Sequence, residues 1–151
     1  MKAKLYFTPE GFKKIGGELN DLLAKRKPAV SELTVARDMG DRSENAAYKS
    51  ARQKLSGLDR RIFNLKMIMR NAQVVERTTN DTVEYGSKVT VECEGHAHTY
   101  YVVGTHEADI AQNKISTYSP LGKKLFGRHL NDEVTVQLPQ GPKNYKITAL
   151  E

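Results

Sequence analysis

The sequence predicts an α+β protein in two parts: an antiparallel helical hairpin over residues 1–78, then a small antiparallel β domain with one short helix over residues 79–151. Two observations predict this division. Apolar residues follow a helical repeat in the first part, and short segments rich in β-branched and aromatic residues follow one another in the second. The charge also divides, with 17 Lys and Arg against 9 Asp and Glu before residue 79, and 7 against 9 after it.

The first part contains two runs in which apolar residues recur at alternating spacings of three and four. Such a narrow stripe is typical of a coiled-coil seam. Because only a few residues around 40–43 separate the runs, the two helices must turn back and pair antiparallel. The seam positions are Phe12, Ile15, Leu19, Leu22, Arg26, Ala29, Leu33 and Ala36 in the first run, and Tyr48, Ala51, Leu55, Leu58, Ile62, Leu65, Met69 and Ala72 in the second.

Local signals place the start of the first helix and its weak points. Thr8 is a good N-cap, and Pro9 suits the first helical position. Pro28 lies inside the helix and is expected to kink it. Glycines within the two helices each cost about 1 kcal/mol relative to alanine, so the seam must carry the stability of the hairpin. These glycines are Gly16, Gly17 and Gly57.

The second part contains five segments with the composition of β-strands, separated by turn signals. They cover residues 87–93, 98–104, 113–117, 132–138 and 144–150. A short helix is predicted between the third and the fourth, with Ser119 as its cap, Pro120 in its first turn and Gly127 at its end.

Composition limits the chemistry of the chain. The single cysteine, Cys93, excludes an internal disulfide and a multi-cysteine zinc site, and no apolar run has the length of a signal peptide or a membrane span, so we expect a cytoplasmic protein. His96 and His98 lie near Cys93 but are more typical of exposed strand residues than of metal ligands. The basic first part favours a polyanionic partner, although a solvated lysine-rich surface would have the same composition.

The segment "GDRSENAAY", residues 40–48, places two carboxylates three residues apart at the turn of the hairpin. Asp41 could cap the second helix, with Ser43 as a competitor, while Glu44 reaches back to form a capping box. Alternatively, the pair supplies two oxygen ligands to a Mg²⁺ ion whose other ligands come from another protein's active site. Arg42, Lys49 and Arg52 could then contact a nucleic-acid backbone, or could serve only as solubilising charges.

The segments "ARDMGDRSENAAYKSARQKL", "LDRRI", "NAQVV" and "SPLGKKLFGRHLNDEVTVQLPQG" closely resemble the Gre family of bacterial transcript cleavage factors. The resemblance implies a coiled coil that enters the secondary channel of bacterial RNA polymerase and an FKBP-like domain that docks on its rim. It also implies cleavage of the extruded 3′ end of nascent RNA in backtracked complexes. Asp41 and Glu44 match the acidic pair that completes the second Mg²⁺ site of the polymerase, and Ser43 and Asn45 match its neighbours.

The same resemblance points to residues 119–122 as the region that contacts the polymerase, namely Ser119, Pro120, Leu121 and Gly122. We expect a monomer that binds no cofactor when free and that is not an enzyme by itself. Two alternatives remain open at this stage. One is a channel binder that regulates the polymerase without cleavage, against which the intact acidic pair argues, and the other is a basic RNA-binding module, which leaves the acidic pair unexplained.

Overall fold

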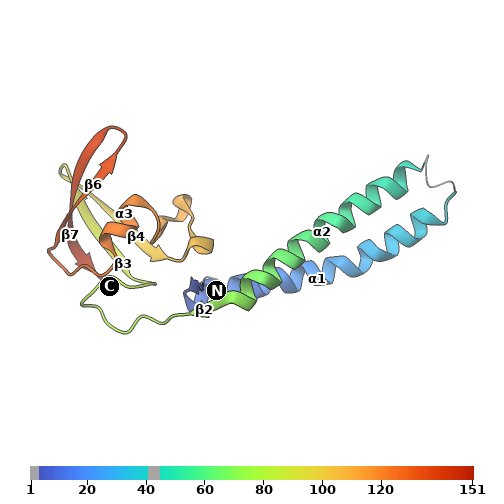
Figure 1. Cartoon of the computed structure of the whole chain (residues 1–151), viewed down its shortest axis with the longest axis horizontal. Coiled ribbons are helices and arrows are strands. Elements are labelled where there is room, and N and C mark those ends of the chain that lie inside the picture. Colours follow the sequence, from blue (N-terminus) through green and yellow to red (C-terminus); the bar gives the residue numbers. More distant parts are fainter. Residues whose placement is uncertain (1–3, 41–44) are drawn as a thin grey trace. The chain divides into compact units, whose positions relative to one another are not determined.

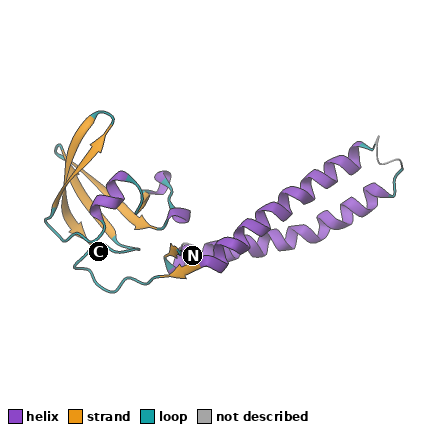
Figure 2. Cartoon of the chain, in the orientation of Figure 1, coloured by secondary structure: helices purple, strands orange, loops and turns teal. Residues whose placement is uncertain are grey.

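The structure is a computed structural model, and it describes residues 4–40 and 45–151. The chain divides into two compact units, one comprising Phe12–Asn71 and the other Met1–Gly11 with Ala72–Glu151. The two long helices make up the first of these units, and the strands lie in the other together with a short helix (Figures 1 and 2). No helix among the described residues combines the length and apolar character needed to cross a membrane.

The helical unit is the predicted hairpin, formed by helices α1 (Pro9–Arg37) and α2 (Ala46–Asn71). Helix α1 begins where the sequence predicts, because the Gly11 N–H donates to the Thr8 hydroxyl at 3.2 Å, as expected for an N-cap residue. The assigned helix continues through Pro28, so the proline does not end it.

Every predicted seam position except Arg26 is buried or half-buried. Arg26 instead donates to Asp59 on the opposite helix at 2.6 Å, and this hydrogen bond raises the pKa of Arg26 above its ordinary value. Two further ion pairs join the helices, Lys54 to Glu32 at 3.1 Å and Arg61 to Glu18 at 2.8 Å. Exposed pairs contribute at most about 1 kcal/mol each, so burial of the seam is the main source of stability and the pairs help to fix its register.

The second unit is built on a five-stranded sheet in the order β5-β4-β3-β7-β6. All five predicted strands form, but β4 and β5 pair in parallel, whereas the sequence predicted only antiparallel pairs. The strands are β3 (Lys88–Cys93), β4 (His96–Val103), β5 (Lys114–Ser116), β6 (Glu133–Leu138) and β7 (Gly141–Leu150). Their alternating inward residues enclose the core, which contains Val83, Val89, Val91, Val102, Leu125, Val134, Val136 and Ile147.

The predicted short helix α3 (Pro120–Leu125) packs against β6. Ser119 caps it, since its hydroxyl accepts from the Gly122 N–H at 3.1 Å. Gly127 follows the helix with a φ of +81°, the left-handed conformation that glycine adopts without strain. The start and end signals that the sequence predicted are therefore both in place.

The N-terminal residues belong to the second unit, which differs from the expected division after residue 78. Strand β1 (Leu5–Phe7) pairs in parallel with β2 (Ala72–Val74). Glu107, at the end of the 3₁₀ helix η1 (Thr105–Glu107), accepts from the Thr8 N–H at 2.8 Å and hydrogen-bonds the Thr8 hydroxyl. A second 3₁₀ helix, η2 (Ile110–Gln112), precedes β5.

The connection between β2 and β3 is held by Glu84. Its carboxylate accepts from the backbone N–H of Thr78 at 2.8 Å and from the hydroxyl of Thr78 at 2.9 Å. These hydrogen bonds stabilise the charged form and lower the pKa of Glu84 below its ordinary value, with the backbone bond as the largest cause. The connection therefore has an anchor that depends on the charge of one carboxylate.

Candidate functional site at the hairpin end

The site predicted from the sequence lies where α1 ends and α2 begins. Asp41, Arg42, Ser43 and Glu44 fall outside the described residues. Asn45 is the described residue that directly follows them, and it is half-buried. Its side chain therefore shows how the end of the hairpin is held.

Asn45 fastens both helices with one amide group. Its Oδ1 accepts from the Tyr48 N–H at 3.0 Å, which satisfies one of the N–H groups that the first turn of α2 leaves without a helical partner. Its Nδ2 donates to the Ala36 carbonyl at 2.6 Å, near the end of α1. Asn45 is thus the N-cap of α2, whereas Asp41 and Ser43, the caps that the sequence suggested, lie outside the described residues.

The two hydrogen bonds of Asn45 are especially important because the buried residues of the seam are smaller at this end of the hairpin than at the other. The end near Asn45 buries alanines, namely Ala36 and Ala51, while the opposite end buries Ile15, Ile62 and Leu65. An alanine removes little apolar surface from water compared with leucine or isoleucine. The hydrogen bonds of Asn45 therefore contribute a larger share of the free energy that holds the two helices together at this end.

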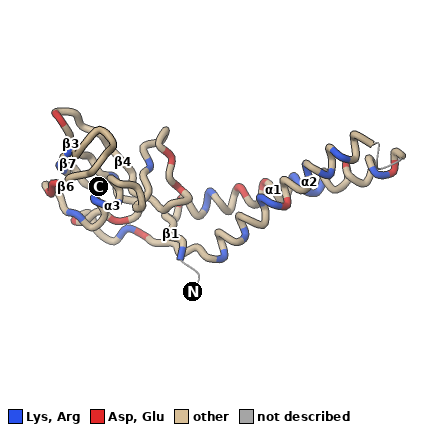
Figure 3. Tube along the Cα trace, turned by 45° about the horizontal axis from the view of Figure 1, so that its top comes forward, with Lys and Arg blue, Asp and Glu red and all other residues tan. Residues whose placement is uncertain are grey.

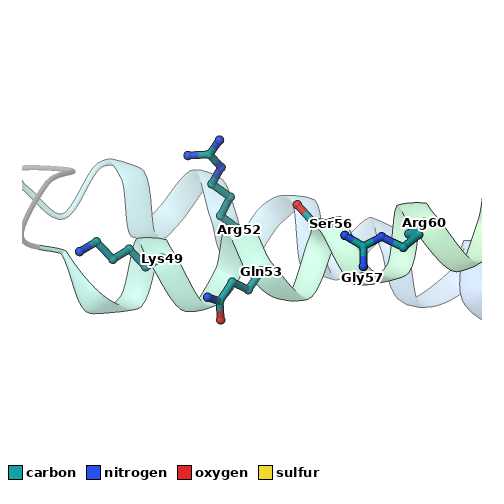
Figure 4. Close-up of a pocket in the computed structure, with 6 residues that line it drawn as sticks. All are labelled: Lys49, Arg52, Gln53, Ser56, Gly57 and Arg60. Carbon is teal, nitrogen blue, oxygen red and sulfur yellow. The ribbon is translucent and has the colours of Figure 1, made fainter.

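A shallow groove of about 430 Å³ runs along α2 below this end. Figure 4 shows the six side chains and backbone positions that line it, all from α2, namely Lys49, Arg52, Gln53, Ser56, Gly57 and Arg60. No carboxylate of the described residues lines the groove. A Cβ added at Gly57 would meet no atom within 4 Å, so the glycine leaves open space in the middle of the groove.

Lys and Arg lie along both helices of the hairpin (Figure 3), and some of them pair with carboxylates while others do not. Lys49, Arg52 and Arg60 form no ion pair with any described residue, whereas Arg26, Lys54 and Arg61 all pair across the seam. Lys49 and Arg52 were predicted as nucleic-acid contacts. Arg60 was missed, although its spacing of eleven residues from Lys49, about three helical turns, places it on a similar side of the helix.

The predicted docking segment has mixed surroundings. Ser119 donates to the Ser116 carbonyl at 2.6 Å, and a Cβ at Gly122 would lie 2.0 Å from that same oxygen, so both residues are needed for the turn itself. Leu121 packs against the core, and Pro120 is exposed. Tyr118 was missed by the sequence analysis, although its ring, 76% exposed, is directly next to the predicted segment.

The other candidates remain apart from these surfaces. Cys93 is buried and reduced, while His96 and His98 are exposed on β4. The described part of the chain contains no group of three or more His, Cys, Asp or Glu side chains that could hold a metal ion.

The fold and this site define a class of protein in which a helical hairpin with a cationic groove is joined to a small β-sheet domain. The chain belongs to the family of GreA/GreB transcription elongation factors. The model of the family's N-terminal domain matches residues 5–74, and the model of its C-terminal domain matches residues 78–151.

Curated relatives support this assignment over the whole chain. A transcription elongation factor GreA of Rhodospirillum rubrum is 39% identical over 150 residues, covering 96% of each chain. A GreA of Geobacillus kaustophilus is 41% identical over 149 residues, covering 95% of this chain and 94% of the relative. A solved structure of the GreA factor homolog 1 of Thermus thermophilus is 24% identical, covers 99% of each chain and superposes with a TM-score of 0.48.

Proposed function

We propose that this chain binds bacterial RNA polymerase, inserts its hairpin into the secondary channel and stimulates cleavage of the 3′ end of backtracked RNA. The polymerase performs the hydrolysis, and the chain is not an enzyme when alone. The observation that carries the proposal is the double hydrogen bond of Asn45, which joins the ends of both helices one residue after Glu44. When the end of a helical hairpin is held by hydrogen bonds, the adjacent acidic segment can enter a partner's active site with little loss of conformational entropy.

Asp41 and Glu44 are the proposed catalytic residues and metal ligands. Carboxylate oxygens are the donors that Mg²⁺ takes in proteins, and two of them make an incomplete site that a polymerase centre could complete. When bound, Mg²⁺ supplies charge neutralisation and an activated water to such a reaction. Since Asn45 already caps α2, neither carboxylate is required for that structural role. Ser43 and Asn45 support the acidic pair, and the free chain carries no cofactor.

The cationic groove is the proposed RNA contact. Lys49 and Arg52 would neutralise phosphates of the extruded RNA, together with Arg42. Their lack of ion pairs among the described residues supports this role, because none of the described carboxylates has to be displaced before a phosphate binds. From Lys49 to Arg60 the helix rises about 16 Å, enough to follow more than one phosphate of an extended strand.

The β-sheet unit would hold the polymerase, with Ser119, Pro120, Leu121 and Gly122 at or near the contact. Its sequence from residue 79 onward has two more acidic than basic residues, which disfavours RNA as its partner. We expect the chain to act as a monomer in the cytoplasm.

A backtracked elongation complex tests this proposal directly. The wild-type chain with Mg²⁺ should shorten the transcript to a product that can be extended again. The Asp41→Asn, Glu44→Gln variant should lose cleavage by about 100-fold or more, with polymerase binding unchanged, and raised Mg²⁺ should recover part of the rate. Near-normal cleavage by this variant would reject the donated-ligand mechanism. Polymerase binding without any cleavage by the wild type would instead support the non-cleaving channel binder.

A further inference from the structure

Helix α2 carries an exposed aromatic ring that the proposed function does not use. Phe63 is 63% exposed, although Ile62 and Leu65, close to it in sequence, are buried in the seam. The other two aromatic residues of the hairpin, Phe12 and Tyr48, are half-buried at seam positions. A single exposed apolar residue is common on a protein surface and by itself indicates no function. The residues that share the surface of the helix with Phe63 therefore decide its interpretation.

The ring of Phe63 shares its face of α2 with arginines. Because an α-helix repeats about every 3.6 residues, Arg52, eleven residues before Phe63, and Arg70, seven residues after it, both lie about 20° from it around the helix axis. Arg60 lies about 60° from it. These three arginines are exposed and form no ion pair with any described residue. Phe63 and Arg70 lie outside the groove that begins at Lys49, so the cationic face extends beyond it and includes an aromatic ring.

The composition of α2 favours a polyanion on this face. The helix contains seven Lys and Arg and a single carboxylate, Asp59. That carboxylate is already paired, because Arg26 of α1 donates to it at 2.6 Å. No ring-stacking or cation–π partner of Phe63 is present among residues 4–40 and 45–151. Single-stranded RNA carries a phosphate and a flat base in every nucleotide, so it matches both the arginines and the ring between them.

We propose that Phe63 stacks against an unpaired base of the extruded RNA, while Arg60 and Arg70 contact the phosphates on either side. This inference rests on the proposed function, since it takes backtracked RNA as the ligand, and it adds a contact to a base to the phosphate contacts of the groove. From Asn45 to Phe63 the helix rises about 27 Å, so the ring meets only RNA that is extruded by several nucleotides. Every base has a flat aromatic face, so Phe63 favours deeply backtracked complexes whatever their sequence.

The test measures cleavage by the full chain in deeply backtracked complexes that carry one abasic nucleotide, placed in turn at each position of the extruded RNA. With the wild-type chain, the abasic nucleotide should slow cleavage about tenfold at one position or at two adjacent positions, because the ring then has no base to stack on. Phe63→Ala should cleave unmodified RNA about tenfold more slowly and should no longer respond to the abasic position. Phe63→Tyr keeps an aromatic ring and should restore both properties.

Asn64→Ala is the matched control, because Asn64 is exposed and next to Phe63 in sequence but lies about 100° away around the helix. The control should cleave unmodified RNA at the wild-type rate. Phe63→Ala should also keep the melting temperature of the wild type, because it removes an exposed ring. Equal cleavage by Phe63→Ala and Asn64→Ala would overturn the inference, as would a wild-type rate that is the same at every abasic position.

Binding to core polymerase without RNA distinguishes a base contact from a protein contact. Phe63→Ala should bind the polymerase as tightly as the wild type does. If its binding is weaker, or if Phe63→Leu cleaves at the wild-type rate, the side chain makes an apolar contact with the polymerase and the inference is wrong. If the wild-type chain shortens no transcript, the proposed function itself is wrong and the inference fails with it.

Discussion

Replacing Asn45 separates the mechanical role of the hairpin end from its chemistry. Asn45→Ala removes both the acceptor for the Tyr48 N–H and the donor to the Ala36 carbonyl. Loss of an N-cap costs about 1 kcal/mol, and a net hydrogen bond contributes about 1 kcal/mol. We therefore expect the end of the hairpin to lose about 2 kcal/mol of local stability.

Asn45→Asp resolves the two contributions. The carboxylate keeps the acceptor for Tyr48 and gains a favourable interaction with the N-terminus of α2, about 0.3–1 kcal/mol, but it cannot donate to Ala36. Its local stability should therefore fall between that of the wild type and Asn45→Ala. Asn64→Ala is the control, because Asn64 is exposed within α2 and alanine is the better helix former.

Amide hydrogen exchange reports this local stability without unfolding the β-sheet unit. Exchange of the Tyr48 N–H should accelerate about 30-fold in Asn45→Ala, which corresponds to about 2 kcal/mol, and much less in Asn45→Asp. Stimulated RNA cleavage should fall in the same order. If Asn45→Ala leaves Tyr48 exchange at the level of Asn64→Ala, the double hydrogen bond does not hold the hairpin end.

Three further outcomes are expected. Neutralising Lys49 and Arg52 together should reduce cleavage in deeply backtracked complexes more than in shallow ones, and an equal loss in both would indicate a folding or docking defect. Gly122→Ala places a Cβ 2.0 Å from a backbone oxygen and should lower the melting temperature by several degrees, whereas Gly57→Ala, made in open space, should raise it slightly. The pKa of Glu84 is lower in the folded state, so its stabilisation of the β2–β3 connection should be fully present above its unfolded pKa of about 4.5 and should be lost as pH falls through the folded value. Amide chemical shifts recorded against pH should show this transition in the wild type and not in Glu84→Gln.

The sequence predicted the elements that depend on local patterns. The two helices followed from apolar repeats that only Arg26 interrupts, and the residues flanking α3 followed from turn and cap chemistry. The pairing of β4 with β5 was predicted with the wrong direction, because β5 has only three residues and the segment that joins it to β4 contains two 3₁₀ helices that the sequence analysis did not predict. Strands β1 and β2 were missed for a similar reason, since three-residue strands about 67 positions apart leave no periodic signal.

The N-cap residue of α2 is a feature of the candidate site that the sequence did not predict. Asp41, Ser43 and Asn45 are all good cap residues, and the glutamate at position 44 suggested a capping box that began at Asp41. Among the described residues, Asn45 directly precedes helix α2, which begins at Ala46. Its second hydrogen bond, to α1, depends on the pairing of the helices and could not be read from local sequence.

The pairing of the helices also determines which basic residues can take part in binding. Arg60 and Arg61 are neighbours in sequence, but successive residues on a helix point about 100° apart. Arg61 makes two hydrogen bonds to Glu18, at 3.0 and 2.8 Å, whereas Arg60 lines the groove and has no such partner among the described residues. A phosphate at Arg61 would have to replace a carboxylate that helps fix the register of the hairpin. A phosphate at Arg60 would displace none of the described carboxylates, so changes at Arg60 can alter binding without disturbing the pairing of α1 and α2.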